Sequence, residues 1–105
     1  MLMEDTKEGN GQEQIKKSEE SIIYIRNEPV MQLAVDVLPI LGKKNKIILR
    51  AKGTSIPNAV AVANIITEKM LKGNSKIEKI KLDTDDAPGI GRMLSTIEII
   101  VIKIQ

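Results

Sequence analysis

Residues 46–71 read KIILRAKGTSIPNAVAVANIITEKML, and within them the hydrophobic pattern changes from the period of a strand to that of a helix. In Lys46–Lys52, three apolar residues alternate with positions that include three cations, which predicts a strand with one apolar and one cationic face. Gly53 breaks this strand, and Pro57 suits the first turn of a helix. The pattern therefore predicts a strand that leads directly into a helix ending at about Leu71.

The predicted helix is apolar around more of its circumference than one buried stripe requires. A surplus of this kind usually indicates a partner subunit. The composition points the same way, because the 42% of hydrophobic residues are almost all aliphatic and Tyr24 is the only aromatic residue. We therefore expect a homodimer whose interface includes Val62, Ile65, Ile66 and Met70.

The flanking sequence completes the order β-α-β-α-β-β. A helix opens at Pro29, follows the i, i+3, i+4, i+7 spacing of one buried face, loosens at Pro39 and can end at Gly42. Residues 42–45 then form the turn into the second strand. The strands are expected at residues 22–25, 46–52, 76–83 and 95–104, with a glycine-containing hairpin tip at residues 84–91.

The chain has 105 residues, which is enough for one domain with a modest core and too few for two. Residues 1–21 are polar, lack sustained periodicity and carry three lysines against six acidic residues, so we interpret them as a disordered acidic arm. A transient helix over residues 13–20 is the alternative. Because the total charge is +2, the predicted folded domain, residues 22–105, has a net charge of about +5 and attracts phosphates only mildly.

The sequence contains no Cys and no His, which limits its chemistry. Disulfides, thiolate nucleophiles, imidazole acid–base catalysis and ordinary zinc sites are excluded. No recognisable spacing supports a carboxylate–metal or Ser–Lys catalytic arrangement, and no apolar run has the length of a membrane span or the form of a signal peptide. We therefore expect a cytoplasmic protein that is not an enzyme, uses no cofactor and contacts no membrane or small-molecule substrate.

Three segments carry a resemblance to a known family. They are EPVM at residues 28–31, RAKG at residues 50–53 followed by Ile56 and Ala59-Val60, and STIEI at residues 95–99. From Ile25 onward, their order and spacing resemble the Alba family of archaeal chromatin and RNA-associated proteins. The resemblance implies a two-layer α+β sandwich like the C-terminal domain of bacterial translation initiation factor three. It also implies a nucleoid-associated homodimer that binds double-stranded DNA, or RNA, with little sequence preference.

The segment RAKGT, residues 50–54, is the best candidate site. Alternation places Arg50 and Lys52 on one strand face, and Gly53 lets backbone N–H groups approach an anion. Because Thr54 or Ser55 can cap the following helix, a positive helix dipole adds to the two cations, and the set suits a phosphate. The alternative is a solvated strand face with an ordinary cap. The candidate nucleic-acid contacts are Arg26, Asn27, Lys44, Arg50, Lys52, Gly53, Thr54, Asn58 and Arg92.

Several positions depart from the pattern of the family. Asn27 and Glu28 replace paired lysines, one of them a regulatory acetylation target, so that regulation is not expected here. Thr54 and Asn58 stand where the family tends to have basic residues. The hairpin, usually basic, is acidic here, and we interpret its carboxylates as solubilising and not as a metal site: Asp83, Asp85 and Asp86. We therefore expect weaker binding than in a fully basic family member.

Two functions stay open at this point. The first is a dimer that places two copies of the Arg50–Lys52 site along one nucleic acid and contacts mainly its phosphate backbone. The alternative is a protein-interaction subunit of a ribonucleoprotein complex, which the apolar surface of the predicted second helix and the acidic arm support. Charge reversal at Arg50 and Lys52 separates the two, because only nucleic-acid binding depends on these cations.

Overall fold

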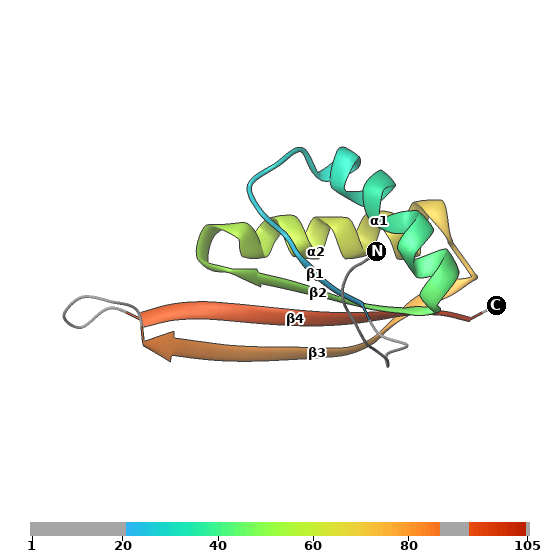
Figure 1. Cartoon of the computed structure of the whole chain (residues 1–105). Coiled ribbons are helices and arrows are strands. Elements are labelled where there is room, and N and C mark those ends of the chain that lie inside the picture. Colours follow the sequence, from blue (N-terminus) through green and yellow to red (C-terminus); the bar gives the residue numbers. More distant parts are fainter. Residues whose placement is uncertain (1–20, 87–92, 105) are drawn as a thin grey trace, which may run out of the picture.

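Four strands form one sheet, and the helices pack on one of its two faces (Figure 1). The computed structural model describes residues 21–86 and 93–104. Its elements are β1 (Ser21–Tyr24), α1 (Val30–Lys44), β2 (Lys46–Lys52), a 3₁₀ turn η2 (Gly53–Ser55), α2 (Ile56–Ile65), a π-helical turn η3 (Ile66–Met70), β3 (Ser75–Asp86) and β4 (Met93–Lys103). The predicted α+β fold and element order are confirmed. The predicted arm, apart from Ser21, and most of the predicted hairpin tip lie outside the described residues.

The strand order in the sheet is β1-β2-β4-β3. β1 and β2 are parallel because α1 carries the chain back between them, and the other two pairs are antiparallel. The register places Tyr24 beside Arg50, Arg50 beside Glu98, and Glu98 beside Lys81. Since residues directly opposite each other share a face of the sheet, these four side chains form one row on one side.

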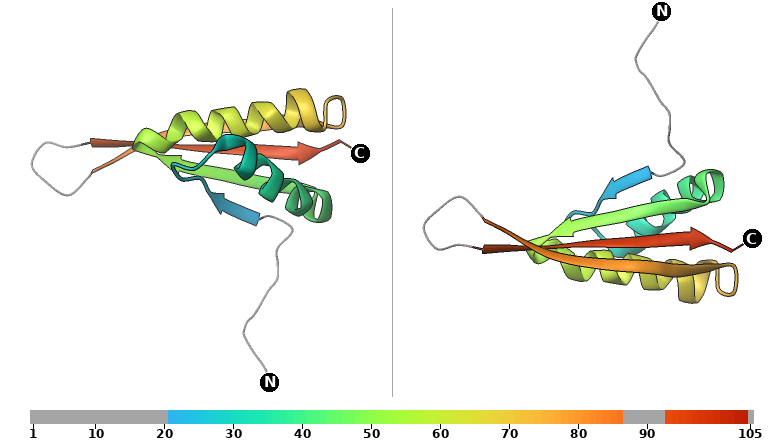
Figure 2. Two further views of the ribbon diagram at one scale, coloured as in Figure 1. Left: turned by 90° about the horizontal axis from the view of Figure 1, so that it is seen from above. Right: turned by 90° about the horizontal axis from the view of Figure 1, so that it is seen from below.

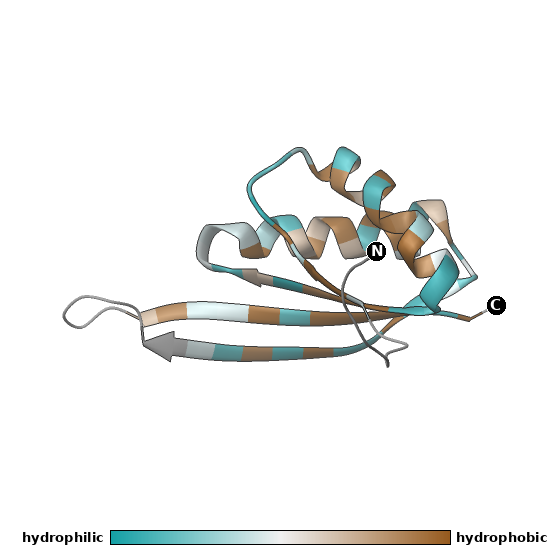
Figure 3. Cartoon of the chain, in the orientation of Figure 1, coloured by the Kyte–Doolittle hydropathy of each residue, from teal (hydrophilic) through white to brown (hydrophobic). Residues whose placement is uncertain are grey.

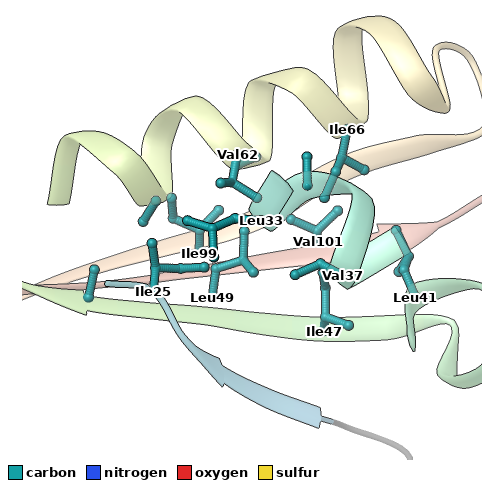
Figure 4. Close-up of a cluster of buried hydrophobic side chains, with 14 of the residues drawn as sticks. Ile25, Leu33, Val37, Leu41, Ile47, Leu49, Val62, Ile66, Ile99 and Val101 are labelled. Atoms are coloured by element: carbon teal, nitrogen blue, oxygen red, sulfur yellow. The ribbon is translucent and has the colours of Figure 1, made fainter. Parts of the chain in front are cut away.

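The hydrophobic core lies between the sheet and the helices (Figure 4). In β2 the predicted alternation is confirmed, because Ile47, Leu49 and Ala51 are buried against the helices. Arg50 and Lys52, on the opposite face of the same strand, remain partly or fully exposed. The alternation of β2 therefore decides which face of the sheet is covered and which carries charge.

Val62 and Ile66 belong to this core, which corrects their assignment to a dimer interface. Both are 0% exposed, and Figure 4 shows them on the side of the helical segment that faces the sheet. Ile65 and Met70 are partly buried and pack against the same core. The domain itself therefore accounts for much of the apolar surplus of this helix, and Val62 and Ile66 offer no surface to a partner.

The two helical segments end close to expectation, with one difference. The second runs through α2 and η3 to Met70, as predicted. The first continues through Gly42 to Lys44, and Asn45 ends it in the left-handed conformation, with φ of 67° and a backbone N–H that donates to the carbonyl oxygen of Leu41 at 2.8 Å. Asn tolerates this conformation better than most residues, so it replaces the glycine expected at a helix end. Within the described ranges, no helix is long and apolar enough to cross a membrane.

β3 and β4 extend beyond the start of α2 (Figure 1). Hydrophilic and hydrophobic residues alternate along much of both strands (Figure 3), as a sheet with two different faces requires. Ile80 and Leu82 pair with the buried residues Ile99 and Ile97 and so point to the helix side. Both remain largely exposed, because β3 is the edge strand and the helices leave this part of it uncovered.

Candidate nucleic-acid interface

The face of the sheet opposite the helices carries cations near the end of β2. Figure 2, in its right panel, shows this face with the strands in front of both helices. Arg50 and Lys52 both lie on it, and together with Lys81 they line one cavity of about 350 Å³. Arg50 and Lys52 neither point apart nor lie inside the core, since both line this cavity.

Arg26 adds a further cation beside Arg50 and Lys52. After β1, the backbone N–H of Ile25 donates to the carbonyl oxygen of Arg50 at 2.8 Å, which holds the following loop against β2. As a result, Arg26 lines a second cavity of about 350 Å³ with Arg50 and Lys52. The fold thus brings Arg26 next to Arg50 and Lys52, which lie more than twenty residues further along the chain.

The loop that carries Arg26 is also tied to the start of the second helical segment. Asn27 Nδ2 donates to Thr54 Oγ1 at 3.3 Å, and Asn58 Nδ2 donates to the carbonyl oxygen of Arg26 at 3.0 Å. The predicted site residues Asn27, Thr54 and Asn58 therefore lie beside the cations. Their hydrogen bonds go to protein atoms, so their described role is to position Arg26.

Gly53 forms the corner between β2 and the helical segment. Its φ of +53° lies in the left-handed region, and a Cβ at this position would lie 3.1 Å from Leu94 Cδ1. Both facts favour glycine, which has no Cβ. Ser55 occupies the N-cap position of α2, but the structure gives it no side-chain capping hydrogen bond. The predicted side-chain cap is therefore not formed by Ser55, although the chain does turn into a helix here.

Glu98 neutralises part of the cationic face. The Arg50 guanidinium donates to Glu98 Oε2 and forms an ion pair with it, and Lys81 Nζ lies 3.9 Å from Glu98 Oε1. Arg50 also donates to the Tyr24 hydroxyl oxygen at 3.2 Å. These hydrogen bonds, first to Glu98 and then to Tyr24, raise the pKa of Arg50 above its ordinary value, so the guanidinium stays charged. A phosphate that approaches Arg50 must compete with Glu98.

Two predicted contacts are not part of this group. Lys44 is the last residue of α1, beside the start of β2, whereas Lys52 is at the end of that strand. A strand rises about 3.3 Å per residue, so the two ends of β2 are about 20 Å apart. Lys44 instead suits the negative end of the α1 dipole. Arg92 lies outside the described residues.

The sequence did not single out Tyr24, Glu98 or Lys81 as partners of Arg50. Tyr24 stood out only as the sole aromatic residue, and Glu98 only as part of the STIEI segment. Their proximity depends on the pairing of β2 with β1 and β4 and of β4 with β3. In the sequence, only the alternation of polar and apolar residues bears on these positions. Alternation predicts on which face of the sheet a side chain lies, but not which residue of the neighbouring strand lies beside it.

Comparison with known proteins agrees with this architecture. A family model described as Alba matches residues 21–84. The DNA/RNA-binding protein Alba of Thermoplasma acidophilum is 38% identical over 73 residues, which cover 69% of this chain and 81% of that protein. The protein of the same name from Methanococcus maripaludis is 34% identical over 89 residues, which cover 80% of this chain and 99% of that protein.

Solved structures give the same result. Alba from Thermoplasma volcanium matches with a TM-score of 0.68 and 34% sequence identity, covering 77% of this chain and 98% of that chain. ALBA1 from Trypanosoma brucei matches with a TM-score of 0.63 over 84% of this chain and 72% of that chain, but at 17% identity it supports the fold alone. The family match over residues 21–84 and the relatives above 30% identity lead to one conclusion: this chain belongs to the Alba family.

Proposed function

We propose that this protein binds DNA or RNA and contacts mainly the phosphate backbone, as a nucleoid-associated protein without catalytic activity. The relatives named DNA/RNA-binding protein Alba support the ligand class. The observation that carries the proposal is the meeting of Arg26, Arg50 and Lys52 around one cavity. Cations from two different strand ends at one place supply the charge that backbone contacts require.

The proposed binding is weaker than a fully basic surface would give. The open-face cavity beside Arg50 is lined by three cations, Arg50, Lys52 and Lys81, but also by two carboxylates, Asp83 and Glu98. Each phosphate contact contributes about 0.9 to the slope of log affinity against log salt concentration. Because Glu98 holds Arg50, the protein makes fewer such contacts than its cations alone suggest. A moderate affinity with a shallow salt dependence follows.

We also propose that the protein acts as a homodimer, through a hairpin patch formed by Ile80, Leu82 and Met93 on the helix side of β3 and β4. Leu82 is 75% exposed and Met93 is 65% exposed. Ile56, at the start of α2, lines the same hollow as Leu82. Exposed apolar side chains on one side of these two strands favour association with a second copy. In the dimer, two cationic strand ends would engage one nucleic acid.

A charge-removal experiment tests the nucleic-acid site. Lys52→Gln should lower the affinity for duplex DNA by about eightfold at 0.1 M salt and reduce the salt slope by about 0.9, the expected effect of losing one phosphate contact. Lys44→Gln removes the same charge from the opposite end of β2 and serves as the matched control. Fluorescence anisotropy titrations against matched DNA and RNA duplexes give both quantities. Equal losses in the two variants would show that the site is misplaced.

A further inference from the structure

We propose that the open face of the sheet binds one unpaired nucleobase of a single-stranded nucleic acid, with the ring of Tyr24 as the stacking surface. This inference rests on the proposed function and adds a ligand class to it. On this proposal, the cationic face has two contact regions: the ring of Tyr24 contacts a base, and the cations contact phosphates. The recognised group is an unpaired base together with its phosphate. Single-stranded DNA and single-stranded RNA both contain this group.

The position of Tyr24 is the first observation. It is the only aromatic residue of the chain, and it is 56% exposed on the uncovered face of an edge strand. The described core is built from aliphatic residues, so this ring contributes little to packing. An exposed aromatic ring on a sheet face is the feature on which single-stranded nucleic acids stack their bases.

The second observation is that Arg50 holds the ring in place. The Arg50 Cζ atom lies 5.7 Å from the centroid of the Tyr24 ring, within the range of a cation–π contact. The same guanidinium donates to the Tyr24 hydroxyl oxygen at 3.2 Å and is itself fixed by Glu98. A ring that is already oriented loses less conformational freedom when a base stacks on it.

The third observation is the chemistry of the cavity beside the ring. Its volume of about 350 Å³ is at the lower end of small-ligand pockets, which suits a single nucleotide more than a larger molecule. Lys52 and Lys81 line it as donors for phosphate or base oxygens, and Glu98 lines it as an acceptor for base N–H groups. Donors, an acceptor and a ring therefore surround one space.

This arrangement distinguishes single strands from duplexes. In a duplex each base face is covered by its neighbours in the stack, so Tyr24 gains no partner there, whereas an unpaired base can be splayed onto the ring. The cations act on the phosphates of both forms. Loss of the ring should therefore weaken single-strand binding selectively, and loss of a cation should weaken both.

Binding of labelled strands of about 12 nucleotides, within the site size of single-strand-binding folds, tests the proposal. Stacking on an aromatic ring is worth about 1–3 kcal/mol per base, so Tyr24→Leu should weaken single-strand binding about fivefold to about 150-fold relative to Tyr24→Phe. Duplex binding should be the same in these two variants, because both lose the hydroxyl that accepts from Arg50. Tyr24→Phe, which keeps the ring, is the matched control and should retain most of the affinity. The same titrations are carried out with DNA strands and with RNA strands, and the tighter binder is the preferred ligand.

A strand with an abasic segment provides a test on the unaltered protein, which stays decisive even if Tyr24→Leu fails to fold. It keeps the phosphates but lacks the bases, so it should bind as weakly as the normal strand binds to the leucine variant. Because the chain has one Tyr and no Trp, quenching of tyrosine fluorescence by the normal strand but not by the abasic strand reports on this site alone.

The outcomes separate this inference from the proposed function. Normal and abasic strands of equal affinity, or equal losses for single strands and duplexes in Tyr24→Leu, would overturn the stacking site while phosphate binding stands. No binding of any strand or duplex by the unaltered protein at low salt would overturn the proposed function itself.

Discussion

Replacing Glu98 by glutamine should tighten nucleic-acid binding and at the same time slightly destabilise the fold. Glutamine has the same shape and keeps a carbonyl oxygen that accepts a hydrogen bond from Arg50, so the geometry of the row is preserved. The change removes one of the two carboxylates that line the open-face cavity. Arg50 is then released from its ion pair and becomes available to a phosphate.

The size of both effects follows from the structure. If Arg50 makes no phosphate contact while paired with Glu98, its full release steepens the salt slope by about 0.9 and raises the affinity by at most about eightfold at 0.1 M salt. The side chains of Arg50 and Glu98 are 32% and 22% exposed, so solvent screens their pair and its loss costs only about 0.5 kcal/mol. For a domain of this size, that loss corresponds to a fall in Tm of about 2–4 °C.

The assay is a set of anisotropy titrations against one DNA duplex between about 50 mM and about 200 mM salt, with a thermal melt of each variant. Glu78→Gln is the matched control, because Glu78 forms its ion pair with Lys46, at 3.4 Å, at the opposite end of β2. It makes the same change in net charge away from the proposed site. If Glu98→Gln binds no more tightly than Glu78→Gln, then Glu98 does not restrain Arg50 and this reasoning is refuted.

Two further predictions concern the corner of the site and the dimer. Gly53→Ala should lower the free energy of unfolding by about 1–2 kcal/mol, because alanine is strained at φ +53° and its Cβ would lie 3.1 Å from Leu94 Cδ1. Chemical denaturation measures this change. An unchanged free energy of unfolding would show that the backbone at residue 53 adjusts without strain. Leu82→Asp should weaken self-association at least about tenfold in analytical ultracentrifugation, because one charge replaces an apolar side chain that is 75% exposed outside the core. Far-UV circular dichroism should remain native in this variant, and an unaltered dimer would place the interface elsewhere.

Periodicity was sufficient to predict the order of the elements and the two faces of β2. The alternation through Ile47, Leu49 and Ala51 fixes which side of this strand is buried, so Arg50 and Lys52 had to share the other side. The same reasoning was weaker for the second helical segment. An apolar residue on a helix is equally suited to a core or to a partner, and Val62 and Ile66 turned out to face the core.

The partners of the cations could not be predicted, because they depend on the register between strands. A shift of the β2–β4 register by two residues would keep every side chain on its face and still separate Arg50 from Glu98. Long-range hydrogen bonds are hidden in the same way: nothing in the local sequence of Asn58 indicates that it holds the carbonyl oxygen of Arg26. Sequence therefore located the cations, but the structure was needed to recognise that one of them is neutralised.

Weak electrostatics and base recognition belong together in this protein. Phosphate contacts lose strength as salt rises, because their free energy comes largely from counterion release. Stacking on Tyr24 involves no net charge and depends much less on salt. In a strongly basic protein, the phosphate term would dominate and a single ring would make little difference. Here Glu98 restrains Arg50, so the proposed contribution of Tyr24 forms a larger share of the total. The preference for single strands over duplexes should therefore persist as salt rises, even as both affinities fall.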